Sequence, residues 1–333
     1  MFGWINDGLY AILNWIQSWS GAWGIAIILF TIMVRLALTP LDIKSRASMR
    51  KTTKLQPQLQ ALQKKYANDK EKLNAKTAEL YKKAHVNPLS SCLPLLLTWP
   101  ILIAVFGAMR TVANREILEQ VGQILNGEQP VMEQFLWIKN LWMPDNLFYS
   151  ALPSENTLRV ISTGEWQTWF AGLEGNMPAL LKDLNLTAAS FESANLSATV
   201  QSIIEAMKTM SFYADGIATI PGYTVPLVNW SVPHLYNGFL LLPILSAVSQ
   251  IAMTKLMGNG TPQPAEGQPN TGKFMQWFFP LFSLWICLGY SAAFALYWVA
   301  GNLVSMGQTF AINKYLEKKE QMAAPVAGEG SVK

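Results

Sequence analysis

The chain has few charged side chains, two cysteines and two histidines. Only 14% of its 333 residues are Asp, Glu, Lys or Arg, whereas soluble domains carry about 25%. The topology argued below puts His85 and His234 on opposite sides of a membrane, so they cannot share a metal. It also separates Cys92 from Cys287, which excludes a disulfide. With no Gly-rich phosphate loop and no nucleophile constellation, the sequence predicts no enzyme, metal site or nucleotide cofactor.

Long apolar runs take the place of the missing charge. A spanning helix needs about 20 mainly apolar residues to cross about 30 Å of hydrocarbon. The sequence predicts five such spans, at 22–41, 91–110, 235–256, 274–290 and 292–310. The last two are nearly contiguous, so Gly289, Tyr290 and Ser291 must turn the chain in a tight hairpin.

The charges between the spans predict the orientation. Segment 42–89 holds twelve Lys and Arg against four acids, and segment 111–234 holds five against twelve. Because basic loops stay in the cytoplasm, 42–89 is predicted inside and 111–234 outside. Five spans then put the N-terminus outside and both the loop 257–273 and the tail 311–333 inside.

Residues 1–20 predict an amphipathic helix in the outer membrane interface. Apolar residues recur there at helical spacing, and Trp15 and Trp19 suit the headgroup depth. The segment has no basic start and no small-residue cleavage site, so it does not resemble a signal peptide. The alternative is a first span that simply begins early.

The basic segment 42–89 is predicted to form an antiparallel helical hairpin. Leu55, Leu59 and Leu62 follow a helical spacing, a polar turn at 67–69 comes next, and a second amphipathic stretch follows. Pro57 is expected to bend the first helix. Such a hairpin is either a solvated connector or a basic arm that touches ribosomal RNA, anionic lipid or a nascent chain.

Arg35 is the clear charge inside a predicted span. An ionised side chain at the centre of a span costs about 2.5–3.5 kcal/mol on insertion scales, so it is normally shielded or functional. Arg35 lies roughly 10 Å from the cytoplasmic end, and its side chain could snorkel part of that way. The functional alternative is a water-filled recess, because no acid lies in any predicted span to pair with it.

Polar stripes on two other spans favour the recess. Ser246, Ser249 and Gln250 share a face of the third span, and Thr31 lies one turn before Arg35. On the fifth span one helical stripe contains Trp298, Asn302, Ser305 and Thr309, with Gln308 beside it. Taken alone, each of these residues more often stabilises helix–helix packing than forms a functional site. Together with a buried Arg, the stripes predict a shared polar cavity.

The runs VRLALTPL, LPILSAVSQ and ALYWVAGNLVSMGQ resemble the YidC/Oxa membrane insertase family, and the resemblance covers all five spans and the hairpin. It implies an all-α integral membrane protein of the bacterial plasma membrane. Five transmembrane helices would surround a hydrophilic groove, open to the cytoplasm and to lipid. A cytoplasmic helical hairpin and the N-terminal interfacial helix would complete this fold.

The resemblance also implies an activity, insertion of other membrane proteins, and the residues that serve it. The family's groove arginine maps onto Arg35. The predicted groove set is Arg35, Thr31, Ser246, Gln250, Trp298, Asn302 and Ser305, and the predicted recruitment set on the hairpin is Arg46, Arg50, Lys51, Lys54, Lys64 and Lys65. Nascent membrane proteins, the ribosome, the Sec translocon and anionic lipids are the implied partners.

Two regions depart from the family pattern. Residues 149–232 resemble an insertion, for which short amphipathic helices forming an outer cap are expected, and GYSAAF lacks the family's Pro-Gly turn. The large outer domain of Gram-negative members has no counterpart in this sequence, which favours a short form from a bacterium with one membrane. A transporter or channel, and a non-inserting assembly scaffold, are the rival functions. No internal repeat supports a transporter.

Overall fold

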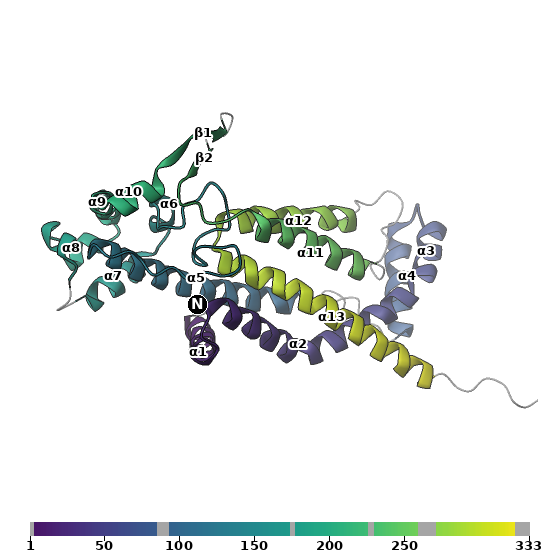
Figure 1. Cartoon of the computed structure of the whole chain (residues 1–333). Helices are drawn as coiled ribbons and strands as arrows, with labels where there is room; N and C mark the ends of the chain where they lie inside the picture. The colour runs from purple at the N-terminus through teal and green to yellow at the C-terminus, as the bar shows by residue number, and fades with distance from the viewer. Residues whose placement is uncertain (1–2, 85–92, 174–176, 226–229, 259–270, 324–333) are drawn as a thin grey trace, which may run out of the picture. The chain divides into compact units, whose positions relative to one another are not determined.

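The computed structural model describes residues 3–84, 93–173, 177–225, 230–258 and 271–323, and it is mostly α-helical (Figure 1). Its helices are α1 (Gly3–Ser20), α2 (Trp23–Lys54), α3 (Gln56–Lys65), α4 (Lys70–Lys83), α5 (Leu93–Leu125), α6 (Glu155–Leu158), α7 (Thr163–Gly172), α8 (Ala179–Asp183), the 3-10 helix η2 (Ala188–Phe191), α9 (Leu196–Lys208), α10 (Ser211–Ile217), α11 (Leu241–Gly258), α12 (Thr271–Gly289) and α13 (Ala292–Ala323). The chain forms two compact units: unit 1 is Met1–Phe30, Ile103–Ala247 and Phe282–Val299, and unit 2 is Thr31–Leu102, Val248–Leu281 and Ala300–Lys333.

Three helices run well past the ends of the predicted spans. Helix α2 continues beyond residue 41, α5 beyond 110 and α13 beyond 310. The hydropathy pattern marks where apolar residues stop, but the polar residues that follow are good helix formers and keep the backbone helical. Helix α11 instead begins at Leu241, several residues after the predicted start at 235. The turn between α12 and α13 falls at Tyr290 and Ser291, as predicted.

Within the described residues, one helix is long and apolar enough to cross a membrane by length and composition. It is α2, whose most apolar window has a mean hydropathy of 2.1. Shorter apolar helices cover Leu241–Leu256 and Gln276–Gly289. The predicted loop 257–273 falls mostly on residues 259–270, and His85 and Cys92 fall on 85–92, outside the described residues.

Unit 1 contains a small sheet that the sequence analysis missed. Strands β1 (Thr219–Val225) and β2 (Trp230–Pro233) pair antiparallel, with Thr219 opposite Pro233 and Val225 opposite Trp230. The inserted segment 149–232 is therefore not helical throughout. Its β-branched and aromatic residues suit a pleated surface, and a search for helical periodicity passes over them.

The rest of the insertion packs on the C-terminal half of α5. The Asn114 amide donates to the Glu165 carboxylate at 2.9 Å, and Arg110 donates to the Val160 carbonyl. Glu165 also completes a capping box with Ser162 at the start of α7. The fully buried Trp166 stacks on Phe191 with ring centroids 5.8 Å apart. The polar contacts attach the insertion to α5, and the aromatic stack packs α7 on η2 within the insertion.

Helix α1 ends at Ser20, just before Gly21, and packs by one face. Gly21 adopts φ 74°, which glycine tolerates and which closes the last turn. Leu13 and Ile16 are buried, whereas Trp15 and Trp19 are 64% and 58% exposed. The separate helix therefore has an apolar face in the core of unit 1 and an aromatic face outside it, and its place at a membrane interface stays a prediction.

A buried polar cluster, which we call the polar knot, fixes the start of α11. It consists of Asn140, Asp145 and Asn237, all fully or almost fully buried. The Asp145 carboxylate accepts N–H groups from the backbone of Phe239 (2.8 Å) and Leu242 (2.7 Å). It also accepts from the backbone of Leu240 at 3.2 Å and from Trp137 Nε1 at 3.0 Å. The Asn237 amide and the Asn140 backbone exchange hydrogen bonds of 2.8 and 2.9 Å.

The stability of unit 1 should fall as the pH rises toward neutrality. Burial raises the pKa of the Glu116 carboxyl from 4.5 to about 7, and Glu119 and Glu133 add to the shift. Between those two values the folded chain binds more protons than the unfolded chain, so each rise in pH favours unfolding. Glu116→Gln should therefore flatten the pH dependence of the thermal unfolding midpoint in detergent. Glu128 is exposed, so Glu128→Gln should keep the pH dependence of wild type. If the unfolding midpoint changes equally with pH in wild type and both variants, the prediction is wrong.

Candidate functional site

Helix α2 places Arg35 against the backbone of α13. The side chain is half-buried. A Cβ atom at Gly301 would lie 3.3 Å from Nη2 of Arg35 and 3.7 Å from Nε. Thr31, one turn earlier on α2, lies over the same glycine at 3.7 Å. The missing side chain at Gly301 thus leaves the room in which the guanidinium lies.

The Arg35 guanidinium makes no hydrogen bond and no ion pair with any residue that the structure describes. Arg35 interacts electrostatically with Asp42, two turns further along α2, whose carboxyl interacts more strongly with Arg46. No acid lies inside a predicted span, and Asp42 lies just beyond the predicted end of the first one. Arg35 therefore keeps its hydrogen-bond donors available beside a weak counter-charge.

Gln308 joins α13 to α2 next to Arg35. Its Nε2 donates to the Arg35 carbonyl oxygen at 2.8 Å and to the Thr39 hydroxyl at 2.7 Å. The other amide atom, Oε1, is buried without a hydrogen-bond partner, and so is the Ser305 hydroxyl one turn earlier. A buried polar atom without a partner costs about 1–3 kcal/mol. Water beside these two atoms would remove that cost, which favours a hydrated polar face on α13.

Polar side chains also connect α11 with α13 in unit 2. The Asn302 amide donates to the Ser249 hydroxyl at 3.0 Å, and both residues are buried. Gln250, the next residue on α11, is half-buried and its side chain makes no hydrogen bond with the described residues. Unit 2 thus assembles polar residues from α2, α11 and α13.

Two residues of the predicted groove set fall in unit 1. The Ser246 hydroxyl donates to the Pro243 carbonyl at 2.7 Å and lies 3.3 Å from the Ser283 hydroxyl. Trp298 packs against Phe294 with ring centroids 5.7 Å apart, and its indole N–H is buried without a partner. A common cavity of Ser246, Trp298 and Arg35 stays a prediction.

Three of the six predicted recruitment cations bind α13, forming what we call the α2–α13 ladder. Arg46 donates to the Thr309 hydroxyl at 2.7 Å. Arg50 pairs with Glu317 at 3.0 Å, and Lys54 pairs with Glu320 at 2.8 Å. The three cations lie four residues apart, one turn of helix each, so they share a face of α2. Exposed pairs of this kind contribute about 0–1 kcal/mol each, so the packing of α2 on α13 depends on the sum of the three contacts.

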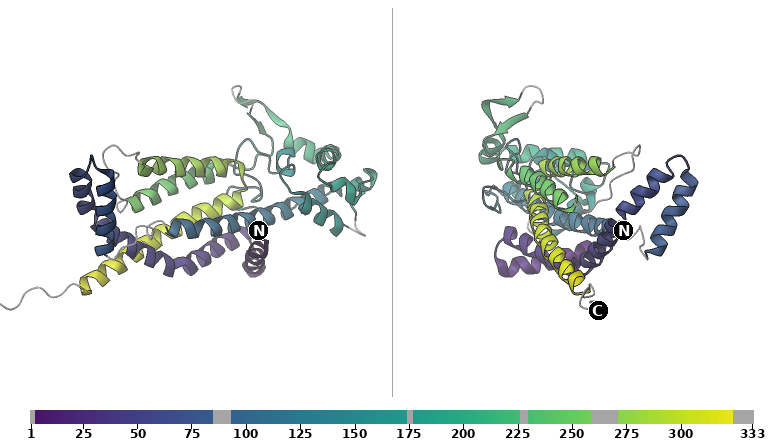
Figure 2. Two further views of the ribbon diagram at one scale, coloured as in Figure 1. Left: turned by 180° about the vertical axis from the view of Figure 1, so that it is seen from behind. Right: turned by 90° about the vertical axis from the view of Figure 1, so that its right-hand side faces the viewer.

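The other three recruitment cations, Lys51, Lys64 and Lys65, are exposed. The latter two end α3, which lies antiparallel to α4 in both views of Figure 2. The break between α2 and α3 comes at Leu55, two residues before Pro57, because a proline cannot donate within a helix and displaces the preceding turn. On α4, ion pairs with Lys76 and Lys83 hold the pKa of the Glu79 carboxyl at about 2.

Several residues of this site were not in the predicted set. Gly301, Thr39 and Asp42 carry no signal in a single sequence, because glycine is common in apolar helices and the other two lie near a span end. Three of the recruitment cations bind α13 and three are exposed, and this difference depends on the path of α13, which the sequence alone does not give. No cluster of His, Cys, Asp or Glu that could hold a metal occurs among the described residues.

Comparison with known proteins gives a consistent result. A family model described as "60Kd inner membrane protein" matches residues 15–320. The "Membrane protein insertase YidC" of Anaeromyxobacter dehalogenans is 38% identical over 42% of this chain and 23% of its own length. That of Fusobacterium nucleatum is 40% identical over 40% of this chain and 58% of its own length. That of Chlorobaculum tepidum is 25% identical over 94% of this chain and 36% of its own length. The chain therefore spans less than two thirds of each of these relatives.

Proposed function

This chain belongs to the 60Kd inner membrane protein family, and from that membership we propose that it is a bacterial inner-membrane protein insertase. Relatives that align with most of the chain are named membrane protein insertase YidC, which supports this role. The proposed activity is to move short hydrophilic tails of client proteins through a cytoplasm-open polar groove. The apolar client helices then leave sideways into lipid.

One observation carries the groove mechanism: the Arg35 guanidinium is unpaired beside buried polar atoms that lack partners. A dry interior would not tolerate this combination. Water in the groove would shorten the low-dielectric path that a polar tail has to cross. Arg35 would attract acidic tail residues while they pass, and Thr31, Gln250, Asn302 and Ser305 would supply hydrogen bonds around it.

The release step needs no nucleotide. Each CH₂ group that leaves water for lipid contributes about 0.8 kcal/mol, so an apolar helix gains enough to offset the transfer of a short tail. The five spans, with the N-terminus outside and the C-terminus in the cytoplasm, are part of this proposal. So are Ser246 and Trp298 as groove residues, and the nascent chain, ribosome, Sec translocon and anionic lipids as partners. The exposed Lys51, Lys64 and Lys65 are the recruitment residues that the proposal favours.

Reconstitution tests the function against its rivals. The purified chain in sealed vesicles should make a radiolabelled single-span client resistant to external protease, without translocon or nucleotide. Empty vesicles and a soluble control protein set the background. A transporter would instead move a solute, and an assembly scaffold would neither protect the client nor move a solute. If several clients are protected no better than in empty vesicles, the proposal is refuted.

Filling the space at Gly301 should weaken insertion without unfolding the protein. The side chain of Gly301→Val would meet Nη2 of Arg35, and overpacking costs about 1–3 kcal/mol. The guanidinium should move aside, and insertion of clients with acidic tails should fall severalfold. Gly307→Val is the matched control, because nothing lies within 4 Å of a Cβ there. If both variants insert these clients equally well, Gly301 does not position Arg35.

A further inference from the structure

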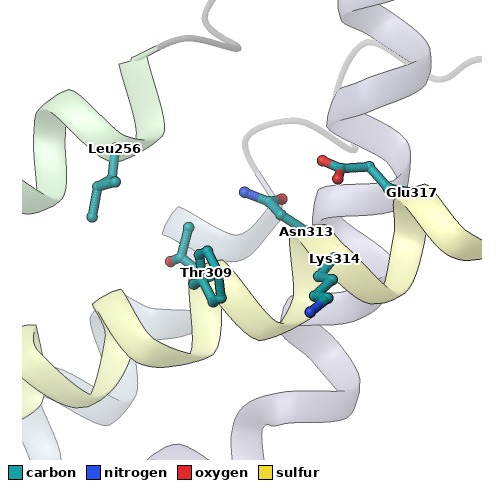
Figure 3. Close-up of a pocket in the computed structure, with 6 residues that line it drawn as sticks. Leu256, Thr309, Asn313, Lys314 and Glu317 are labelled. Atoms are coloured by element: carbon teal, nitrogen blue, oxygen red, sulfur yellow. The ribbon is translucent and has the colours of Figure 1, made fainter.

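A pocket of about 400 Å³ lies in unit 2, at the predicted cytoplasmic end of its polar region. Leu256, from the end of α11, forms one wall, and Thr309, Phe310, Asn313, Lys314 and Glu317 of α13 form the other (Figure 3). The pocket lies beside the α2–α13 ladder, since Thr309 and Glu317 belong to both. Its chemistry differs from that of the groove region around Arg35.

The apolar lining of the pocket lies where the predicted spans end. Leu256 and Phe310 are the last residues of the predicted third and fifth spans, and they are 51% and 73% exposed. Two large exposed apolar side chains at that level suit the upper part of an acyl chain and its glycerol. Residues one turn further along α13 then lie at the depth of lipid phosphates.

The polar lining offers donors and little free acceptor capacity. The Glu317 carboxylate is bound by Arg50 at 3.0 Å. The Thr309 hydroxyl accepts from Arg46 at 2.7 Å and donates to the Ser305 carbonyl at 2.6 Å. The Lys314 ammonium and the Asn313 side-chain amide make no ion pair or hydrogen bond within the described residues. A pocket with a free cation, a free amide and a neutralised acid suits an anion.

We propose that this pocket binds the phosphate headgroup of an anionic phospholipid of the cytoplasmic leaflet. Lys314 and Asn313 bind the phosphate, and Leu256 and Phe310 contact the glycerol and the first acyl methylenes. An acidic client segment could also pair with Lys314, but it would make no apolar contacts with the exposed Leu256 and Phe310 at the bilayer edge. The assignment rests on the predicted spans of the proposed insertase and not on any role of Arg35.

Lipid retention by the purified full chain tests the site. Native mass spectrometry in detergent would count phosphatidylglycerol and phosphatidylcholine molecules bound during a titration with each. Wild type should hold one phosphatidylglycerol more tightly than phosphatidylcholine. Lys314→Gln should weaken that site about fivefold, because a basic residue near an anionic lipid contributes about 1 kcal/mol. Phe310→Gln should weaken phosphatidylglycerol binding as well. Lys318→Gln removes the same charge from an exposed position outside the pocket lining and should have no effect.

Equal phosphatidylglycerol binding by wild type and Lys314→Gln would overturn the proposal, as would equal binding of the two lipids by wild type. A peptide that crosslinks to the Asn313→Cys variant in place of lipid would show that the pocket takes clients instead. Insertion assays in vesicles that contain phosphatidylglycerol run in parallel. Failure of insertion there refutes the proposed function and leaves the lipid result standing.

Discussion

Arg35→Ala is expected to lower insertion of clients with acidic tails about tenfold, because a hydrogen bond to a charged group contributes about 1.5–3 kcal/mol. The thermal unfolding midpoint should barely change. Among the described residues the guanidinium makes no hydrogen bond or ion pair, so the substitution breaks none. It also removes the cost of keeping a charge half-buried. Protease protection of a radiolabelled client in sealed vesicles gives the insertion rate.

Two comparisons separate charge from shape in that experiment. Arg35→Lys keeps the positive charge and should retain most of the activity on acidic tails. A client whose tail carries no acid should insert into Arg35→Ala vesicles nearly as well as into wild type. Wild-type rates for the acidic client with Arg35→Ala would remove Arg35 from the mechanism. A large loss of thermal stability would show that the side chain is structural.

Asp145→Ala should destabilise the protein by about 3 kcal/mol or more, since one buried and three part-buried N–H groups lose their acceptor at once. Three of those groups belong to the backbone at the start of α11, where the helix dipole also favours a negative charge. The midpoint of thermal unfolding in detergent should fall by several degrees. Protease sensitivity around residues 237–242 should rise.

Asp183→Ala is the matched control for that variant, because Asp183 is an exposed acid at the end of α8. It should leave the unfolding midpoint unchanged. Asp145→Asn keeps the shape and one acceptor oxygen, so it should fall between Ala and wild type. An Asp145→Ala protein as stable as wild type would mean that water replaces the carboxylate. The polar knot would then not hold α11.

The sequence predicts the family and the mostly helical fold because both depend on long patterns. The runs around Arg35 and Asn302 carry the resemblance, and the match of the family model over residues 15–320 confirms it. Arg35 itself stands out because a charge within an apolar run is rare. These signals need no knowledge of which helix packs on which.

The remaining features depend on contacts between distant segments. Gly301 matters because Arg35 lies on it, and Asp145 matters because α11 begins beside it. The pairing of β1 with β2 depends on two short stretches with no helical period. The helix ends differ from the predicted span ends because helix propensity continues after hydropathy falls, as in α2 beyond residue 41. A single sequence does not contain these pairings.

The α2–α13 ladder has a mechanical consequence for the basic arm. Arg46, Arg50 and Lys54 fasten α2 to α13 right up to its last residue. Any swing of α3 and α4 that keeps these contacts must pivot at Leu55, where the helix breaks. A lever made of the ten residues of α3 then sweeps an arc of about 15 Å radius. The far end of α3 can therefore change position while α2 stays fixed to α13.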